Sequence, residues 1–158
     1  MAIEIERKFL VKGSFKEQAF THHRIVQGYL CIQPGKTVRI RIYGDKGFIT
    51  IKGASNHSMV SRFEWEKEIS VDEATSLLNL CDDGVIDKTR YLVRSGSHTF
   101  EVDEFEGANK GLIMAEVELK EEQEPFISPA FIGEEVTHDS RYYNSQLLTH
   151  PFSSWERK

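Results

Sequence analysis

Polar and apolar residues alternate along much of this chain. In residues 2–10, the charged residues Glu4, Glu6 and Lys8 alternate with residues that are mostly apolar. A period of two is typical of a β-strand, because successive side chains of a strand point to opposite faces. The same alternation predicts further strands at 24–33, 36–43, 47–53, 60–69, 85–94, 98–105 and 112–121. The total is about eight strands, a number typical of a small closed barrel.

Turn and cap signals separate the predicted strands. The stretch 44–47, Gly-Asp-Lys-Gly, offers the positive φ that a tight hairpin turn requires. Ser70 and Glu73 have the spacing of a capping box, which predicts a short helix with Leu77, Leu78 and Cys81 on its apolar stripe. A helical turn is also indicated near 15–20.

The alternation stops after Pro125. The apolar residues that follow suggest helices packed on the strands: Phe131, Ile132, Val136, Leu147 and Leu148. We therefore expect residues 1–158 to form a single domain of class α+β, a barrel with a few peripheral helices.

Composition narrows the functional classes. A chain of 158 residues with 39% hydrophobic content is long enough for one globular domain with a core. Its net charge of -5 argues against a nucleic-acid partner. Cys31 and Cys81 match no zinc motif and the N-terminus lacks a signal peptide, so we expect a reduced, cytoplasmic setting. No stretch approaches the ~20 apolar residues that span a bilayer, so we expect no membrane partner.

Charged residues are segregated by sign on the predicted strands. One interpretation is a solvated surface, on which each exposed ion pair contributes ~0–1 kcal/mol. However, nearly every strand contributes to the set, and a sheet closed around that face would make it a lumen, with helices covering the apolar outer face. The cations are Lys8, Arg39, Arg41, Lys52, Arg62, Lys88 and Arg90. The carboxylates are Glu4, Glu6, Glu64, Glu66, Glu68, Glu101, Asp103, Glu116 and Glu118.

Such a lumen suits a polyanion and a metal. Buried ions are costly unless they are paired, hydrated or bound to a ligand. Arginine offers a rigid fork to phosphate oxygens and lysine a mobile charge, while Mg²⁺ and Mn²⁺ prefer carboxylate oxygens. Glu4 and Glu6 lie two residues apart, roughly 6–7 Å along a strand, so their side chains can converge on one ion.

A series of motifs resembles the CYTH domain family, also called triphosphate tunnel metalloenzymes. The family signature ExExK is present as Glu4, Glu6 and Lys8, and the resemblance covers nearly the whole chain. The other blocks, in order, are QGYL (27–30), VRIR (38–41), ITIKG (49–53), EWEKEI (64–69), KTRY (88–91), EVDEF (101–105), AEVEL (115–119) and GEEVTHDSRYYN (133–144).

The resemblance implies an antiparallel eight-stranded barrel that forms a tunnel, and hydrolysis of a triphosphate with Mg²⁺ or Mn²⁺. It implies Glu4, Glu6 and Glu118 as metal ligands, with Glu116 and Asp103 as candidates for a second ion or bound water. The cations would grip the phosphates: Lys8, Arg39, Arg41, Lys52, Arg62, Lys88 and Arg90. Glu64 or Glu66 is the candidate that accepts the proton of the attacking water.

Tyr29 has two interpretations. It shares a strand face with Gln27 and would pair with Lys8 in a catalytic dyad of the kind that the resemblance implies. Alternatively, it is an amphipathic tyrosine that packs in the barrel wall.

Three functions remain open. The first is an inorganic triphosphatase, which the compact chain favours because it has no evident platform for an organic group. The second is a hydrolase of nucleoside or thiamine triphosphate, or an adenylate cyclase, since fold does not settle substrate. The third is a non-catalytic module that binds polyphosphate or triphosphate, against which the intact carboxylate motifs argue. Barrel edges and helix faces leave a homodimer open.

Overall fold

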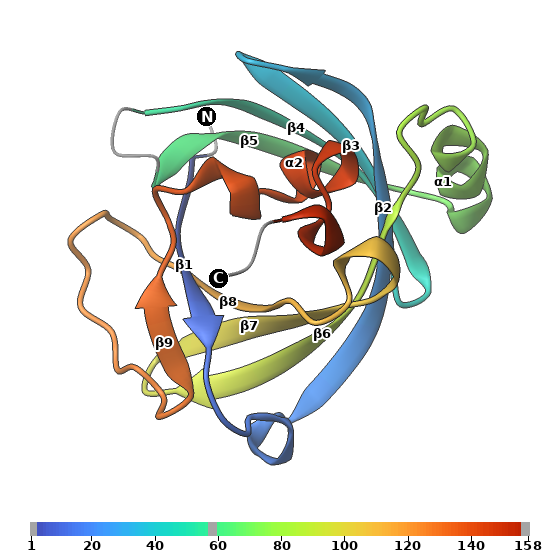
Figure 1. Ribbon diagram of the computed structural model, residues 1–158. Helices are drawn as coiled ribbons and strands as arrows, with labels where there is room; N and C mark the ends of the chain where they lie inside the picture. Colours follow the sequence, from blue (N-terminus) through green and yellow to red (C-terminus); the bar gives the residue numbers. More distant parts are fainter. Residues whose placement is uncertain (1–2, 57–59, 156–158) are drawn as a thin grey trace.

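The computed structural model describes residues 3–56 and 60–155 and is a closed antiparallel β-barrel (Figure 1). The strands follow the order β5-β4-β3-β2-β6-β7-β8-β1, and pairing of β5 with β1 closes the barrel. The predicted eight-stranded barrel is confirmed, although residue 2 of the first predicted strand lies outside the described residues. The strands are β1 (Ile3–Val11), β2 (Thr21–Gln33), β3 (Lys36–Tyr43), β4 (Lys46–Ser55), β5 (Ser61–Ile69), β6 (Ile86–Ser95), β7 (His98–Phe105) and β8 (Ile113–Glu118).

The charged face of the strands points into the barrel. β1 pairs with β8 in a register that sets Glu6 opposite Glu118 and Lys8 opposite Glu116. Residues paired directly across two strands project to the same face of a sheet. All four side chains line cavities inside the barrel, so this face is the lumen.

The segment after Phe131 differs from the prediction. We expected a helix at Phe131, Ile132 and Val136, which is wrong, because Ile132–Glu135 form a further strand, β9, on the edge of β1. β5 pairs only with the beginning of β1, so the rest of that edge has backbone groups that need other partners. β9 supplies partners from Phe9 onward, and three apolar residues do not distinguish such a short edge strand from a helix.

Helix α1 (Val71–Leu78) has the predicted capping box. The Glu73 amide donates to the Ser70 hydroxyl, and the Ser70 amide donates to the Glu73 carboxylate, both at 3.0 Å. The helix lies outside the barrel against β3 and β4. A Cβ at Gly47 would come within 2.9 Å of the Ala74 Cβ, so this close approach requires glycine.

The expectation that helices cover the outer apolar face holds only for the α1 side. On the opposite side, the outward Phe9 and Phe100 are buried, and their ring centroids each lie 5.9 Å from that of Phe126. Phe126 belongs to the irregular segment 120–131. The 3₁₀ turn η1 (Lys16–Gln18) follows Phe15, which joins the same apolar cluster. This wall is therefore covered mainly by irregular chain.

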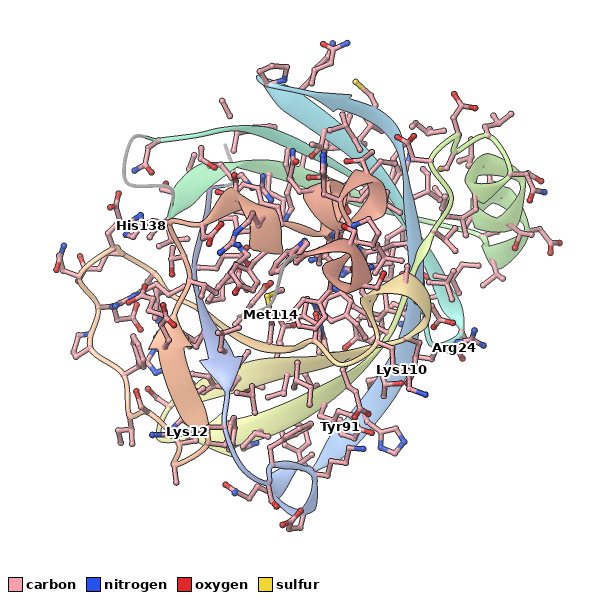
Figure 2. The ribbon with its side chains drawn as sticks, in the orientation of Figure 1. Lys12, Arg24, Tyr91, Lys110, Met114 and His138 are labelled. Atoms are coloured by element: carbon pink, nitrogen blue, oxygen red, sulfur yellow. The ribbon has the colours of Figure 1, made fainter. Side chains whose placement is uncertain are left out.

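The C-terminal segment closes one end of the barrel. Helix α2 (Asn144–Thr149) contains the predicted helical Leu147 and Leu148 and is seen within the ring of strands in Figure 1. Leu147 is fully buried against inward-facing residues such as Phe105 and Met114, and Figure 2 shows Met114 near the centre of the ring. The remaining 3₁₀ turns are η2 (Gly107–Asn109), η3 (Ser140–Tyr142) and η4 (Phe152–Ser154).

No helix in residues 3–56 and 60–155 is long and apolar enough to cross a membrane. Cys31 and Cys81 are free thiols.

Candidate active site

Two adjoining cavities lie along the lumen of the barrel. The inner one lies beneath the C-terminal segment and has a volume of about 40 Å³, and the other has about 170 Å³ and only charged residues in its lining. Together they are lined by every site residue expected from the sequence except Asp103. Of these residues, the inner cavity has Glu6, Lys8, Tyr29, Arg39, Lys52, Arg62, Lys88, Arg90 and Glu116. The second has Glu4, Glu6, Arg39, Arg41, Lys52, Glu64, Glu66, Arg90, Glu116 and Glu118.

Glu4 on β1 faces Lys52 on β4 and Glu64 on β5. The Lys52 Nζ donates to both Glu4 carboxylate oxygens, at 2.9 and 3.0 Å, and lies 3.5 Å from Glu64. Burial and the Glu6 charge alone would raise the pKa of Glu4, but Lys52 outweighs them and lowers it. Burial and the neighbouring Glu4 raise the pKa of Glu64 to about 7. The pKa values of the two carboxyl groups are thus shifted in opposite directions, that of Glu4 downward and that of Glu64 upward.

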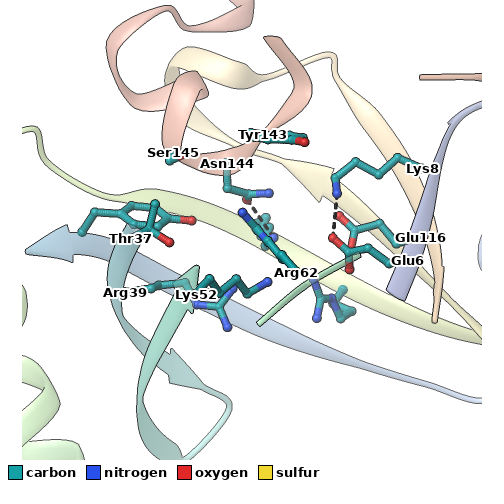
Figure 3. Close-up of a pocket in the computed structure, with 13 residues that line it drawn as sticks. Glu6, Lys8, Thr37, Arg39, Lys52, Arg62, Glu116, Tyr143, Asn144 and Ser145 are labelled. Carbon is teal, nitrogen blue, oxygen red and sulfur yellow. Dashed lines mark hydrogen bonds and ion pairs between the residues drawn. The ribbon is translucent and has the colours of Figure 1, made fainter. Parts of the chain in front are cut away.

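A second carboxyl pair surrounds Lys8. The Lys8 Nζ donates to the Glu6 carboxylate at 2.6 Å (Figure 3). Burial alone would raise the pKa of Glu6, but Lys8 and Lys52 lower it well below its ordinary value. Burial and the Glu6 charge raise the pKa of Glu116 to about 7. Burial and the charge of Glu4 also raise the pKa of Glu118, so carboxylates outnumber their cations on this wall.

The donor set of this wall fits a hard divalent cation. Its oxygens belong to Glu4, Glu6, Glu116 and Glu118. Burial and the neighbouring carboxylates raise the pKa of Glu116 and of Glu118, and a bound cation would offset both effects. Within the described ranges, no three acidic, histidine or cysteine side chains already converge as a metal site. Lys8 engages Glu6 and Lys52 engages Glu4, so metal binding would exchange these contacts for contacts with the cation.

Two inward cations of β6 are held by carboxylates of β7, the strand next to β8. The Arg90 guanidinium contacts both oxygens of Asp103, at 2.8 and 2.9 Å, and the Lys88 Nζ lies 2.8 Å from the same carboxylate. The side chains of Lys88 and Asp103 are each only 2% exposed. Burial alone would raise the pKa of Asp103, but Arg90 and Lys88 lower it. Asp103 lies behind the cavity lining and holds two of the predicted phosphate-binding cations in place.

Arg39 and Arg41 project side by side from β3. Their guanidinium nitrogens lie 3.6 and 3.4 Å from one oxygen of Glu66, which also accepts a 2.7 Å hydrogen bond from Thr50. Burial and the like charge of Arg39 lower the pKa of Arg41 to about 10. Both Nε atoms are buried and have no hydrogen-bond partner within the described chain. One carboxylate shared by two guanidinium groups leaves donors available for an anion.

Tyr29 and Lys8 line the same cavity but are engaged by other groups. Gln27 donates to the Tyr29 hydroxyl at 3.4 Å, whereas Lys8 lies 5.1 Å from the ring centroid of Tyr143. In the described residues no hydrogen bond joins Tyr29 to Lys8. Their pairing remains a prediction.

Sequence reasoning missed the contribution of the C-terminal segment. Tyr143, Asn144 and Ser145 reach the inner cavity from above, and the Asn144 amide oxygen accepts a 2.9 Å hydrogen bond from Lys88 (Figure 3). These residues lie at the junction of η3 and α2, where no alternation marks an inward face. The sequence signal for Tyr143 and Asn144 was membership of the final motif block, 133–144, and Ser145 lies directly after that block.

Comparisons with known proteins agree with this geometry. A family model of the CYTH domain matches residues 2–147. The chain is 43% identical to an inorganic triphosphatase of Acetivibrio thermocellus, over 99% of both chains. It is 36% identical to an inorganic triphosphatase of Nitrosomonas europaea, covering 91% of this chain and 95% of the relative. A solved structure of an inorganic triphosphatase superposes with a TM-score of 0.66 at 34% identity, covering 94% of this chain and 95% of that one.

Proposed function

Because the chain belongs to the CYTH domain family, we propose that it is a divalent-metal-dependent inorganic triphosphatase that cleaves the terminal phosphate inside the barrel. One observation carries the proposal: the inward cations of β3 and β6 and the carboxylates of β1, β5 and β8 line the same narrow lumen. A linear phosphate chain needs many fixed positive charges, and a metal needs carboxylate oxygens. Both requirements are met in one enclosed space.

The cations bind and orient the phosphate chain in this proposal. Arg39 and Arg41 have donors to offer because they share Glu66. On β6, two strands away from β3 in the sheet, Asp103 holds Lys88 and Arg90 in place, so little reorganisation is required when charge develops on the transferred phosphoryl group. Lys8, Lys52 and Arg62 would exchange part of their contact with glutamates for contact with phosphate oxygens.

The metal would be held by Glu4, Glu6 and Glu118, with Glu116 beside them. When bound, a divalent cation neutralises phosphate charge and makes a bound water more acidic. Phosphate release measured with Mg²⁺ and with Mn²⁺ distinguishes which metal the enzyme prefers. Asp103 is engaged by Lys88 and Arg90, so we assign it to holding those cations rather than to a second ion.

Glu64 is our candidate for the group that accepts the proton of the attacking water. A base is most effective when its pKa is close to the working pH, and that of Glu64 is raised to about 7. Glu66 instead accepts hydrogen bonds or ion contacts from Thr50, Arg39 and Arg41, so we assign it to orienting the arginines. Tyr29 and Lys8 would contact the substrate from the inner cavity.

The test is phosphate release from inorganic triphosphate, ATP and thiamine triphosphate, each with Mg²⁺, with Mn²⁺ and with EDTA. We expect rapid, EDTA-sensitive release that is fastest with inorganic triphosphate. Cleavage of ATP alone would support a nucleotide enzyme, and product analysis would separate hydrolysis from cyclisation. If nothing is cleaved but triphosphate raises the melting temperature in EDTA, the barrel is a binding module and the catalytic roles are wrong.

A further inference from the structure

Asn144 is held at a fixed position above the lumen. It begins helix α2, whose Leu147 is fully buried in the apolar cluster that closes the barrel end. The segment before it is joined to β1, because the Val136 amide donates to the Lys8 carbonyl at 2.8 Å and the Lys8 amide donates to Thr137 at 2.9 Å. The backbone that carries Asn144 is therefore tied to the strand that carries Lys8.

The chemistry of lysine fixes the orientation of the Asn144 amide. The Lys88 ammonium has only hydrogen-bond donors, so the Asn144 atom 2.9 Å from it must be the carbonyl oxygen. The amide nitrogen then points to the other side. In the described part of the chain, this Nδ2 group makes no hydrogen bond, although Asn144 lines the inner cavity. Figure 3 shows the Asn144 side chain extending into that space above Arg62.

The charges that line the inner cavity indicate which ligand the Asn144 Nδ2 group binds. The inner cavity is lined by more cations than carboxylates, and its carboxylates are Glu6 and Glu116. Glu6 already accepts from Lys8. An amide N–H does not bind metal cations, but it donates readily to phosphoryl oxygens, each of which accepts more than one hydrogen bond. A phosphate oxygen is therefore the acceptor that fits this position.

The same contact orients Lys88. Two of its three ammonium hydrogens are directed to Asp103, at 2.8 Å, and to Asn144, at 2.9 Å. The third is left for the cavity that Lys88 lines. Asn144 and Lys88 thus present one neutral and one charged donor to the same space.

We propose that Asn144 is a substrate-binding residue whose Nδ2 donates to a phosphoryl oxygen while its Oδ1 directs Lys88 toward the same phosphoryl group. This inference rests on the proposed triphosphatase function and adds a contact from outside the strands. It makes the segment that closes the barrel part of the substrate site.

Asn144→Asp and Asn144→Ala separate this role from a structural one. Aspartate keeps an oxygen acceptor for Lys88 but replaces the N–H donor by a negatively charged oxygen. We expect Asn144→Ala to raise KM for inorganic triphosphate about tenfold, as for one lost hydrogen bond to a charged group. We expect Asn144→Asp to raise it about a hundredfold or more, because phosphate then meets a like charge. If Asn144 only holds Lys88 or the helix, the aspartate variant will bind better than the alanine variant, and the proposal is wrong.

Two further measurements complete the test. Thr149→Ala, at the far end of α2 and outside the inner cavity, is the control for general weakening of the helix and should leave KM unchanged. Calorimetric titration with triphosphate in EDTA measures binding without turnover. If the wild type binds triphosphate without cleaving it and Asn144→Asp binds it more weakly, the role of Asn144 is supported and the proposed triphosphatase function is wrong. If the wild type cleaves triphosphate and Asn144→Asp has the same KM, the proposed function is supported and the role of Asn144 is wrong. A wild type that neither binds nor cleaves triphosphate would contradict both.

Discussion

Two walls of the lumen carry similar charged side chains in different proportions. On β6 and β7, Asp103 is shared by Lys88 and Arg90, Arg90 also pairs with Glu101 at 3.2 Å, and the pKa of Asp103 is lowered. On β1, β5 and β8, several carboxylates share Lys8 and Lys52, and one member of each close carboxyl pair has a pKa raised to about 7. The first wall is electrostatically satisfied without a ligand, and the second is not.

The difference assigns separate tasks to the two walls. A saturated ion cluster gains little from a metal and is suited to holding cations in a fixed position. A cluster with excess carboxylate gains from a divalent cation, which replaces the shared protons. In the sequence, Asp103 and the glutamates of β1 and β8 are all carboxylates expected to face inward, and all were candidates to bind metal. The number of cations around each carboxylate now distinguishes Asp103, which holds cations, from the glutamates that remain candidate metal ligands.

The largest effect is expected at the carboxylate-rich wall. Glu6→Ala should lower metal-dependent triphosphate turnover by at least about 1,000-fold, or about 4 kcal/mol, because the site loses a ligand of the activating metal. Steady-state kinetics with Mg²⁺ and Mn²⁺ measures this loss. Glu104→Ala removes a carboxylate that pairs with the exposed Lys16 and should leave activity unchanged. Normal turnover of Glu6→Ala would exclude Glu6 as a metal ligand.

Asp103→Asn should instead act on stability. It leaves Lys88 and Arg90 buried without their shared carboxylate, and breaking a buried ion pair costs about 3–5 kcal/mol. Urea unfolding at neutral pH measures the free energy. Asp87→Asn on β6, the strand of Lys88 and Arg90, is the control, because the partner of Asp87, Arg24, is 70% exposed and the loss should stay below about 1 kcal/mol. If both variants lose the same free energy of unfolding, the Asp103 cluster is not the strongly stabilising ion cluster described for this wall.

Glu116→Gln should show a pH-dependent gain in stability without metal. The folded pKa of Glu116 is raised to about 7 from an ordinary value of 4.5, so the folded state retains a proton that the unfolded state has released between these values. Wild-type stability therefore falls as pH rises from 4.5 to about 7, and glutamine, which stays neutral, avoids this loss. The variant should gain up to about 3 kcal/mol above pH 7 and nothing near pH 4. Unfolding in EDTA across this range is the measurement, and a gain that does not vary with pH would contradict it.

Tyr29→Phe should have the smallest effect. It removes one hydroxyl that lines the inner cavity, and a neutral hydrogen bond contributes about 0.5–1.5 kcal/mol, so kcat should fall by about two- to tenfold. Tyr91→Phe is the control, because that ring packs against Phe15 outside the cavities. Rates within about twofold of wild type would make Tyr29 a packing residue rather than a member of a dyad.

Much of the barrel could be predicted from local pattern. Period-two alternation located the eight barrel strands, and the Ser70–Glu73 spacing located the start of α1, because each depends on neighbours in sequence. β9 could not be found in this way. Its four residues form a strand because β1 leaves part of one edge unpaired, and that condition is set by residues far away in the chain.

The candidate site shows the same division. Sequence by itself determined which residues alternate with the apolar ones and so which charges share a face of each strand. Only the tertiary structure decided that Lys52 meets Glu4, 48 residues away, that Asp103 holds two cations, and that Asn144 reaches Lys88 from the closing segment. The reason is physical: alternation is a property of one strand, whereas hydrogen bonds, burial and pKa depend on which strands barrel closure brings together.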